Sequence, residues 1–177
     1  MLLYHKKQKT NLLTHYSRGS DFISEITLDG NTLSSSEIWR AAKNNLQVKL
    51  SDDSWDRIIK SRKVVEDILT SGEIVYGINT GFGSLVNQTI SDEDLQQLQV
   101  NLIRSHATGI GELMSRASVR CMMIVRINSF AKGFSGVHPN VVQQLIDFVN
   151  LGITPAVPRI GSLGASGDLA PLSHMAL

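Results

Sequence analysis

The sequence GSLGASGDLAPL at residues 161–172 is the most informative stretch of this chain. It places three glycines and two serines directly before an apolar segment, and Pro171 suits the first turn of a helix. The pattern predicts a glycine-rich loop that ends where a helix begins. On composition alone the loop is a flexible connection, and either Ser166 or Asp168 is the N-cap of the helix.

Two chemical interpretations of this loop compete with the plain one. Free amides before a helix can bind a phosphate, although the lysine that follows the glycines of a P-loop does not follow here. Alternatively, the triplet Ala165-Ser166-Gly167 can cyclise, because no side chain hinders attack of the Gly167 nitrogen on the Ala165 carbonyl. Cyclisation releases one water, and loss of the Ser166 hydroxyl releases a second and leaves an electrophile. The residues alone leave all three interpretations open.

Upstream of this loop, the spacing of apolar residues predicts a mainly helical chain. Several of the predicted helices begin at a serine that can cap them and end at a glycine. Between them we expect a hairpin-like turn at 26–33, around Asp29-Gly30-Asn31, and an extended segment at 154–158, where prolines restrict the backbone. The predicted helices are residues 34–46, 51–72, 91–103, 115–132 and 139–152.

Composition restricts the possible partners and compartments. The chain has 177 residues, with 17 Lys and Arg against 16 Asp and Glu, so no basic surface predicts a nucleic-acid or membrane partner. No apolar run approaches the length of a membrane span, and the N-terminus lacks a secretory signal pattern. The single cysteine, Cys121, excludes an intrachain disulfide, and no Cys/His pairs predict a metal site. We expect a cytoplasmic protein with a flexible tail at 1–21 and one domain at 22–177.

Two further segments contain candidate functional residues. Tyr76 and Asn79 lie in the glycine-containing sequence YGINTGFG at 76–83, which on its own is typical of a packing turn. His106 follows a predicted helix, where a histidine is usually a satisfied polar residue at the helix end. The residues alone therefore favour a structural role for both segments.

A family resemblance changes this balance. The sequence of residues 161–174 closely resembles the signature of the aromatic amino-acid ammonia-lyases, and the likeness extends to NLIRSHA at 101–107 and RINSFAKG at 126–133, as well as to 76–83. It covers roughly residues 25–177. The resemblance implies a mainly α chain from the all-helical ammonia-lyase (fumarase/aspartase-like) fold, with short hairpins and glycine-rich active-site loops. The chain would be the N-terminal, prosthetic-group-forming domain, truncated before the central helical bundle.

The resemblance also implies a prosthetic group and a base. In this family the triplet Ala165-Ser166-Gly167 cyclises autocatalytically to a 4-methylidene-imidazol-5-one, so that no external cofactor and no metal is needed. The matching Tyr76 takes a proton from the substrate β-carbon, which requires a pKa below the usual value near 10 for a phenol. Together they eliminate ammonia, which makes the enzyme a carbon-nitrogen lyase.

The remaining site residues follow from the same resemblance. Asn79 and Gly83 would lie near the substrate and a mobile lid, and Asp168 would orient the cyclising loop or cap the following helix. The pair Ser105-His106 matches the histidine-selective members, because an imidazole can exchange a hydrogen bond with a substrate imidazole. We therefore expect L-histidine as substrate and urocanate as product, in histidine breakdown.

The resemblance also implies an oligomer and a longer chain. Family members are homotetramers whose sites combine several subunits, so we expect the 177-residue chain on its own to be inactive. The apolar turn at 174–177 has no capping residue, which favours a chain cut within a helix. The alternatives are a phenylalanine or tyrosine ammonia-lyase, an aminomutase of the same family, or a truncated non-catalytic paralogue that binds a partner subunit.

Overall fold

A computed structural model of the chain describes residues 24–80, 92–165 and 167–177. Helices dominate this part of the chain, as the sequence predicts, and short strands form two separate pairs. In chain order the elements are β1 (Glu25–Leu28), α1 (Ser35–Asn44), β2 (Gln47–Leu50), α2 (Asp52–Ser71), α3 (Asp92–His106), β3 (Ile110–Leu113), α4 (Arg116–Phe130), α5 (Pro139–Leu151), β4 (Pro158–Ile160) and α6 (Ala170–Ala176).

Local capping explains where the helices begin and end. The Ser34 hydroxyl accepts a hydrogen bond from the Glu37 amide at 3.3 Å, and the Glu37 carboxylate accepts one from the Ser34 amide at 2.9 Å, so α1 begins with a capping box. Helices α2 and α5 end at glycines in the left-handed region, Gly72 with φ 73° and Gly152 with φ 71°. These boundaries confirm the sequence predictions. The predicted start of α3 at Ser91 lies outside the described residues.

The predicted hairpin-like turn at 26–33 is wrong. Strand β1 instead pairs in parallel with β2, with Ile26 opposite Val48. The turn around Asp29 leads into α1. The Asp29 carboxylate accepts hydrogen bonds from the Asn31 amide at 2.7 Å and from the Thr32 amide at 2.9 Å. These bonds, the one from Thr32 first, lower the pKa of Asp29 from 3.8 to about 2. A parallel pair needs a crossover, and α1 provides it.

The second edge of β2 is occupied by a side chain. Asn150, near the end of α5, accepts a hydrogen bond from the Val48 amide at 2.8 Å and donates one to the Val48 carbonyl at 2.9 Å. The carboxamide thus bonds to β2 as a third strand would. The other strand pair is antiparallel, with Ile110 of β3 opposite Ile160 of β4, and neither of these two strands adjoins β2.

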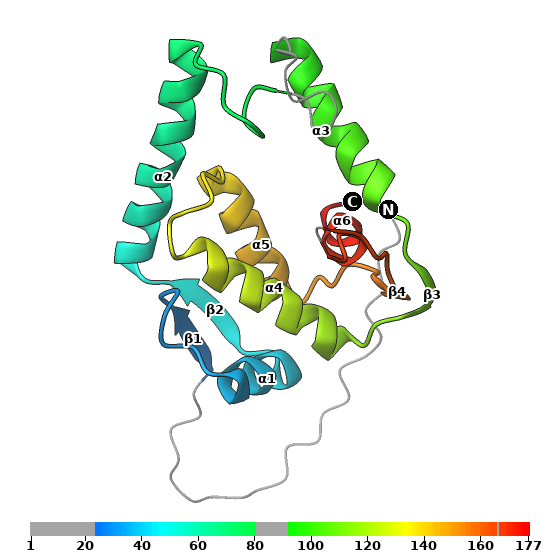
Figure 1. Cartoon of the computed structure of the whole chain (residues 1–177). Coiled ribbons are helices and arrows are strands. Elements are labelled where there is room, and N and C mark those ends of the chain that lie inside the picture. The colour runs from blue at the N-terminus through cyan, green and yellow to red at the C-terminus, as the bar shows by residue number, and fades with distance from the viewer. Residues whose placement is uncertain (1–23, 81–91, 166) are drawn as a thin grey trace, which may run out of the picture.

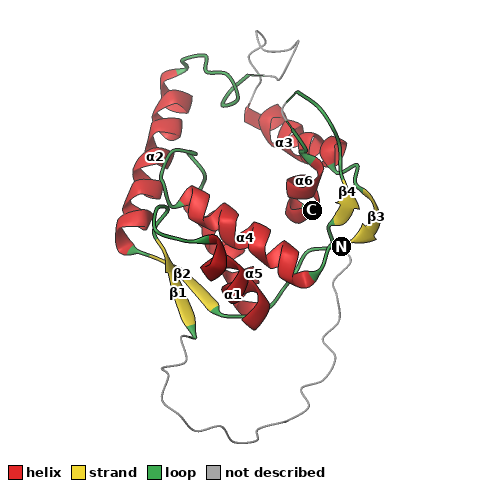
Figure 2. Cartoon of the chain, turned by 60° about the horizontal axis from the view of Figure 1, so that its bottom comes forward, coloured by secondary structure: helices red, strands yellow, loops and turns green. Residues whose placement is uncertain are grey.

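The hydrophobic core lies between α1, α4, α5 and the β1–β2 pair. Figure 1 shows α4 and α5 at the centre, with α2 and α3 on opposite sides, and Figure 2 shows the same arrangement from a second direction. Helix α4 contributes the largest share of the core. Fully buried core side chains include Leu28, Ile58, Val119, Met123, Ile124, Ile127, Val142 and Val149.

One buried cation joins three parts of this core. Arg120 of α4 is only 1% exposed, and its guanidinium donates to the Val149 carbonyl at 2.6 Å and to the Leu46 carbonyl at 3.2 Å. Val149 lies in the last turn of α5, where the helix dipole favours a positive charge. Burial lowers the pKa of Arg120 from its usual value. The side chain therefore ties the end of α5 and the segment after α1 to α4.

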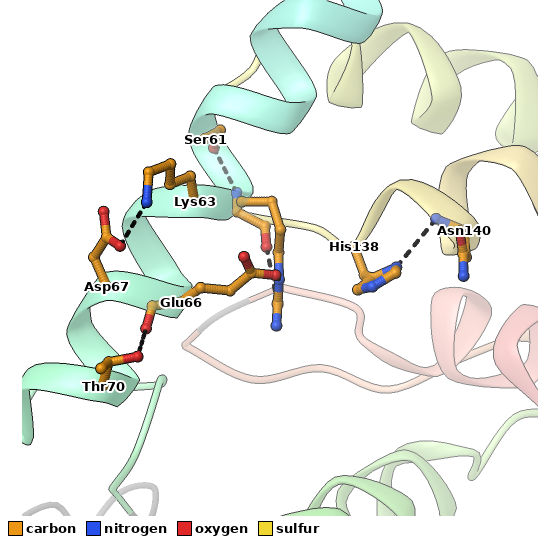
Figure 3. Close-up of polar contacts among 9 residues, drawn as sticks. Ser61, Lys63, Glu66, Asp67, Thr70, His138 and Asn140 are labelled. Atoms are coloured by element: carbon orange, nitrogen blue, oxygen red, sulfur yellow. Dashed lines mark hydrogen bonds and ion pairs between the residues drawn. The ribbon is translucent and has the colours of Figure 1, made fainter.

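Helix α2 is held against the connection between α4 and α5. The Gly136 amide donates to the Ser61 hydroxyl at 2.8 Å, and Arg57 donates to the Ala131 carbonyl at 3.0 Å. Figure 3 shows Ser61 facing this connection, whereas the Lys63–Asp67 ion pair (2.9 Å) lies on the other side of α2. His138, in the same view, caps α5 by accepting from the Asn140 amide at 3.2 Å.

We predict that Arg120→Met destabilises the protein by about 3 kcal/mol, because two buried carbonyls lose a charged hydrogen-bond donor. The measurement is the free energy of unfolding from urea denaturation. Arg126→Met, on the same helix, is the matched control. Its guanidinium lies 4.4 Å from the centre of the Phe130 ring, a contact that contributes about 0.5–1 kcal/mol. Equal losses for the two variants would contradict the role given to Arg120.

Candidate functional site

Ala165 and Gly167 lie in the connection between β4 and α6, which a hydrogen bond closes on either side of them. The Gly167 amide donates to the Gly164 carbonyl at 3.0 Å, and Gly167 has φ 85°, a conformation that favours glycine. A Cβ at Gly167 would meet nothing within 4 Å, so the backbone conformation and not crowding accounts for the glycine. Ser166 lies outside the described residues. The turn thus bends the chain at the triplet that the sequence singles out.

Asp168 closes the base of this loop. Its Oδ1 accepts hydrogen bonds from the Ser162 amide at 2.8 Å, the Ser162 hydroxyl at 3.2 Å and the Ala170 amide at 3.2 Å. These bonds, that from the Ser162 amide first, lower the pKa of Asp168 below its ordinary value of 3.8. The same carboxylate occupies the space that a Cβ at Gly161 would need. One side chain therefore joins the start of the loop to the first turn of α6.

The predicted N-cap of α6 needs a correction. The capping position belongs to Leu169, which makes no side-chain capping bond, and not to Ser166 or Asp168. Asp168 still accepts from the Ala170 amide, so it satisfies a free donor of the helix from one residue further out. The same carboxylate also accepts from the Ser162 amide, so it contacts both the start of the loop and the first turn of α6.

His106 ends α3 with its ring orientation fixed. Its Nδ1 lies 2.7 Å from the Leu102 carbonyl, and the Ser105 hydroxyl donates to the same carbonyl at 2.9 Å. Because a carbonyl only accepts, Nδ1 carries the proton, and Nε2 is the acceptor of the neutral ring. The local pair Ser105-His106 therefore sets one tautomer of the imidazole.

Tyr76 and Asn79 lie on the connection that follows α2. The Tyr76 side chain is 60% exposed, whereas Asn79 is buried. The Asn79 carboxamide accepts from the Val75 amide at 2.9 Å and donates to the Glu73 carbonyl at 2.7 Å, so it is bonded to the backbone that precedes Tyr76. Gly83 lies outside the described residues. The predicted contact of Asn79 with substrate stays a prediction, and in this structure its carboxamide holds the loop.

The structure brings two of the three candidate segments together. Helix α6 lies beside α3 (Figures 1 and 2), and the Gly109 amide donates to Nε2 of His174 at 2.9 Å. This contact connects the segment after His106 to the helix after the triplet. Tyr76 lies on the connection that follows α2. The sequence motif contains His174, but nothing in the pattern reveals Gly109 as its partner.

Two negative findings apply to the described residues alone. In residues 24–80, 92–165 and 167–177, no group of three or more His, Cys, Asp or Glu side chains is placed to hold a metal ion. No helix in that part of the chain is both long and apolar enough to cross a bilayer. The candidate groups in the described residues are the glycine-rich turn, the Asp168 carboxylate that bonds to both of its ends, the His106 imidazole and the Tyr76 phenol.

Solved structures define the class of protein to which this fold belongs. Tyrosine aminomutase from Streptomyces globisporus superposes with a TM-score of 0.79 and 38% identity, over 86% of this chain and 28% of that chain. Histidine ammonia-lyase from Trypanosoma cruzi superposes with a TM-score of 0.78 and 36% identity, over 86% of this chain and 29% of that chain. The fold is that of amino-acid ammonia-lyases and aminomutases, as the sequence resemblance implies.

Sequence comparison identifies the family. The model of the aromatic amino acid lyases matches residues 33–177, and the chain belongs to that family. Histidine ammonia-lyase from Streptococcus pyogenes serotype M5 is 45% identical over 152 residues, which are 86% of this chain and 30% of that protein. The chain spans about 30% of the length of the curated relatives it matches.

We predict that the Ser162 and Ala170 amides sense the charge of Asp168. The pKa of Asp168 is lowered in the folded chain, so its stabilisation of the loop is complete above about pH 4 and is lost as the pH falls through the folded pKa. Both amide NMR signals should therefore titrate together, with a midpoint below 3.8. Asp168→Asn should abolish this titration. A midpoint at or above the ordinary value would contradict the bracing contacts.

Proposed function

We propose that the whole protein is a histidine ammonia-lyase, which eliminates ammonia from L-histidine to give urocanate in histidine breakdown. The observation that carries the proposal is the closed turn at Ala165–Gly167, in a chain of the aromatic amino acid lyase family. The identity of 45% with a curated histidine ammonia-lyase supports the choice of substrate.

The triplet fits the prosthetic group that this family implies. Cyclisation needs a bend at the triplet and a nitrogen at its third residue that no side chain hinders. The Gly164–Gly167 hydrogen bond supports the first, and the glycine at position 167 supports the second. Ala165, Ser166 and Gly167 would then form the 4-methylidene-imidazol-5-one. That group supplies an electrophile, which makes departure of ammonia from the substrate possible. Asp168 holds the loop closed by its bonds to Ser162 and Ala170.

Tyr76 is the proposed base. Its side-chain oxygen would accept the β-proton of the substrate as a general base. The large exposure of the ring supports access by a substrate, and the bonds of Asn79 to Val75 and Glu73 hold the loop in place. We assign Asn79 and Gly83 to the substrate-binding region on the family motif.

His106 is the proposed determinant of substrate selectivity. With Nδ1 donating to Leu102, its Nε2 can accept the N–H of a substrate imidazole. A phenyl or phenol ring would leave this acceptor unpaired, which disfavours phenylalanine and tyrosine. The chain is also similar to a tyrosine aminomutase. An aminomutase would form a β-amino acid, so this product is measured as the alternative.

We also propose a cytoplasmic homotetramer, whose subunits together complete the site. Large apolar side chains lie on the surface of this chain, among them Leu163, which is 99% exposed, and Phe134, which is 90% exposed. Exposure of large apolar side chains is typical of a surface that further polypeptide covers, from the same protein or from another subunit. For the same reason we expect no elimination activity from residues 1–177 alone.

The first test is the intact mass of the protein purified from its native source. The proposal predicts a mass short of the calculated value by two waters, together with urocanate formation from L-histidine. Ser166→Ala has no hydroxyl to lose, so it should not reach that mass. The kcat of this variant should fall by at least roughly 10³-fold. That loss is only part of the rate acceleration of about 10⁶-fold or more that enzymes achieve over the uncatalysed reaction. Native protein at full calculated mass and without activity would refute the proposal in favour of a non-catalytic paralogue.

The second test replaces His106. In the whole enzyme, His106→Leu should lower kcat/KM for L-histidine by roughly 10²-fold or more, because the substrate imidazole loses its acceptor. The kcat/KM of the same variant for L-tyrosine or L-phenylalanine should rise. The control is His138→Leu, since His138 only caps α5. An unchanged preference in His106→Leu would remove His106 from the selectivity site.

A further inference from the structure

His174 makes a contact that spans two parts of the site. Its Nε2 accepts the Gly109 amide proton at 2.9 Å, so the neutral ring carries its own proton on Nδ1. His174 lies in α6, the helix that follows the triplet, and Gly109 lies three residues after His106. The bond therefore joins two segments that are 65 positions apart in sequence.

Gly109 lies closely packed at this contact. A Cβ there would lie 2.9 Å from Nε2 of His174 and 3.2 Å from Cβ of Pro158, so the backbone sits directly between the imidazole and the first residue of β4. An alanine would have to displace one of these neighbours. The glycine is thus explained by close approach, since its φ is not positive.

The contact closes a ring of structure around the site. From Gly109 the chain continues into β3, which pairs with β4, and β4 leads into the loop of the triplet. That loop ends at α6, whose His174 returns to Gly109. On the other side of Gly109, the Thr108 amide donates to the His106 carbonyl at 2.8 Å, so a tight turn separates His106 from the bond. A shift of Gly109 is therefore transmitted to His106 over a very short path.

We propose that His174 is a positioning residue that sets the place of His106 relative to the helix following the triplet, and thereby the affinity for the substrate side chain. This inference rests on the proposed function, because it concerns the same site. A displacement of a binding group by as little as about 1 Å is costly to an enzyme. His174 acts through the backbone of 106–109 and is not given any contact with substrate.

The experiment compares three variants of the whole enzyme. His174→Phe keeps an aromatic ring and removes the acceptor, whereas His174→Gln offers a carboxamide oxygen near the position of Nε2. Ser173→Ala is the matched control, because the Ser173 hydroxyl donates to the carbonyl of Leu169, the capping residue of its own helix, at 3.0 Å. Steady-state kinetics with L-histidine, intact mass and hydrogen exchange of residues 107–113 are measured for each.

We expect His174→Phe to raise KM for L-histidine roughly fivefold to tenfold, the effect of one lost hydrogen bond, with kcat changed less than about threefold. Exchange of the Gly109 amide should become faster, and the intact mass should still be short by two waters. His174→Gln should restore KM to within about threefold and slow the exchange again. Ser173→Ala should match the parent enzyme in all three measurements.

Other outcomes overturn the inference. An unchanged KM in His174→Phe, or equal effects in His174→Phe and Ser173→Ala, would leave His174 as an ordinary packing residue of α6. Unchanged exchange at Gly109 would show that the bond does not hold the segment. A failure of the proposed function is recognised separately, because in that case the unmutated enzyme forms no urocanate from L-histidine. KM is then measured for the aromatic amino acid that the enzyme does eliminate, and an unchanged value again overturns the inference.

Discussion

A buried guanidinium that bonds to carbonyls, and to no carboxylate among the described residues, fixes the centre of this fold. Arg120 balances its charge with the carbonyl end of α5 and with the segment after α1. Burying a cation is costly unless its donors are bonded. Two bonds to carbonyls hold the end of α5 and the segment after α1 against α4, while Nε of the same guanidinium is buried without a partner among the described residues. The chain leaving α5 therefore starts from a fixed point, and from there it leads to β4 and to the loop of the triplet.

The helices were predictable from sequence because their boundaries depend on near neighbours. A serine bonded three residues ahead, as at Ser34, or a glycine with positive φ, as at Gly72, acts within one turn. The strands were not predictable in the same way. Strand β2 is four residues long and pairs with a strand across an intervening helix, and the hairpin expected at 26–33 was wrong because local turn residues do not determine the pairing partner.

The site shows the same division between local and distant information. Sequence resemblance locates the triplet and His106, and the hydrogen bond of His106 to the Leu102 carbonyl lies within one turn of its own helix. Two features require the folded chain. The Asn79 carboxamide is engaged by its own loop, and His174 meets a backbone amide far away in sequence. Neither contact leaves a periodic or compositional signal, because one partner in each case is main chain.

The side chain of Asn150 has a consequence for folding and aggregation. An open strand edge is a template for pairing with another chain, and the carboxamide of Asn150 shields that edge of β2 at Val48. The shield comes from a residue 102 positions later, so it exists only after α5 has docked. During synthesis, β1 and β2 emerge well before their cover. Until α5 docks, the edge of β2 at Val48 is open to pairing with another chain.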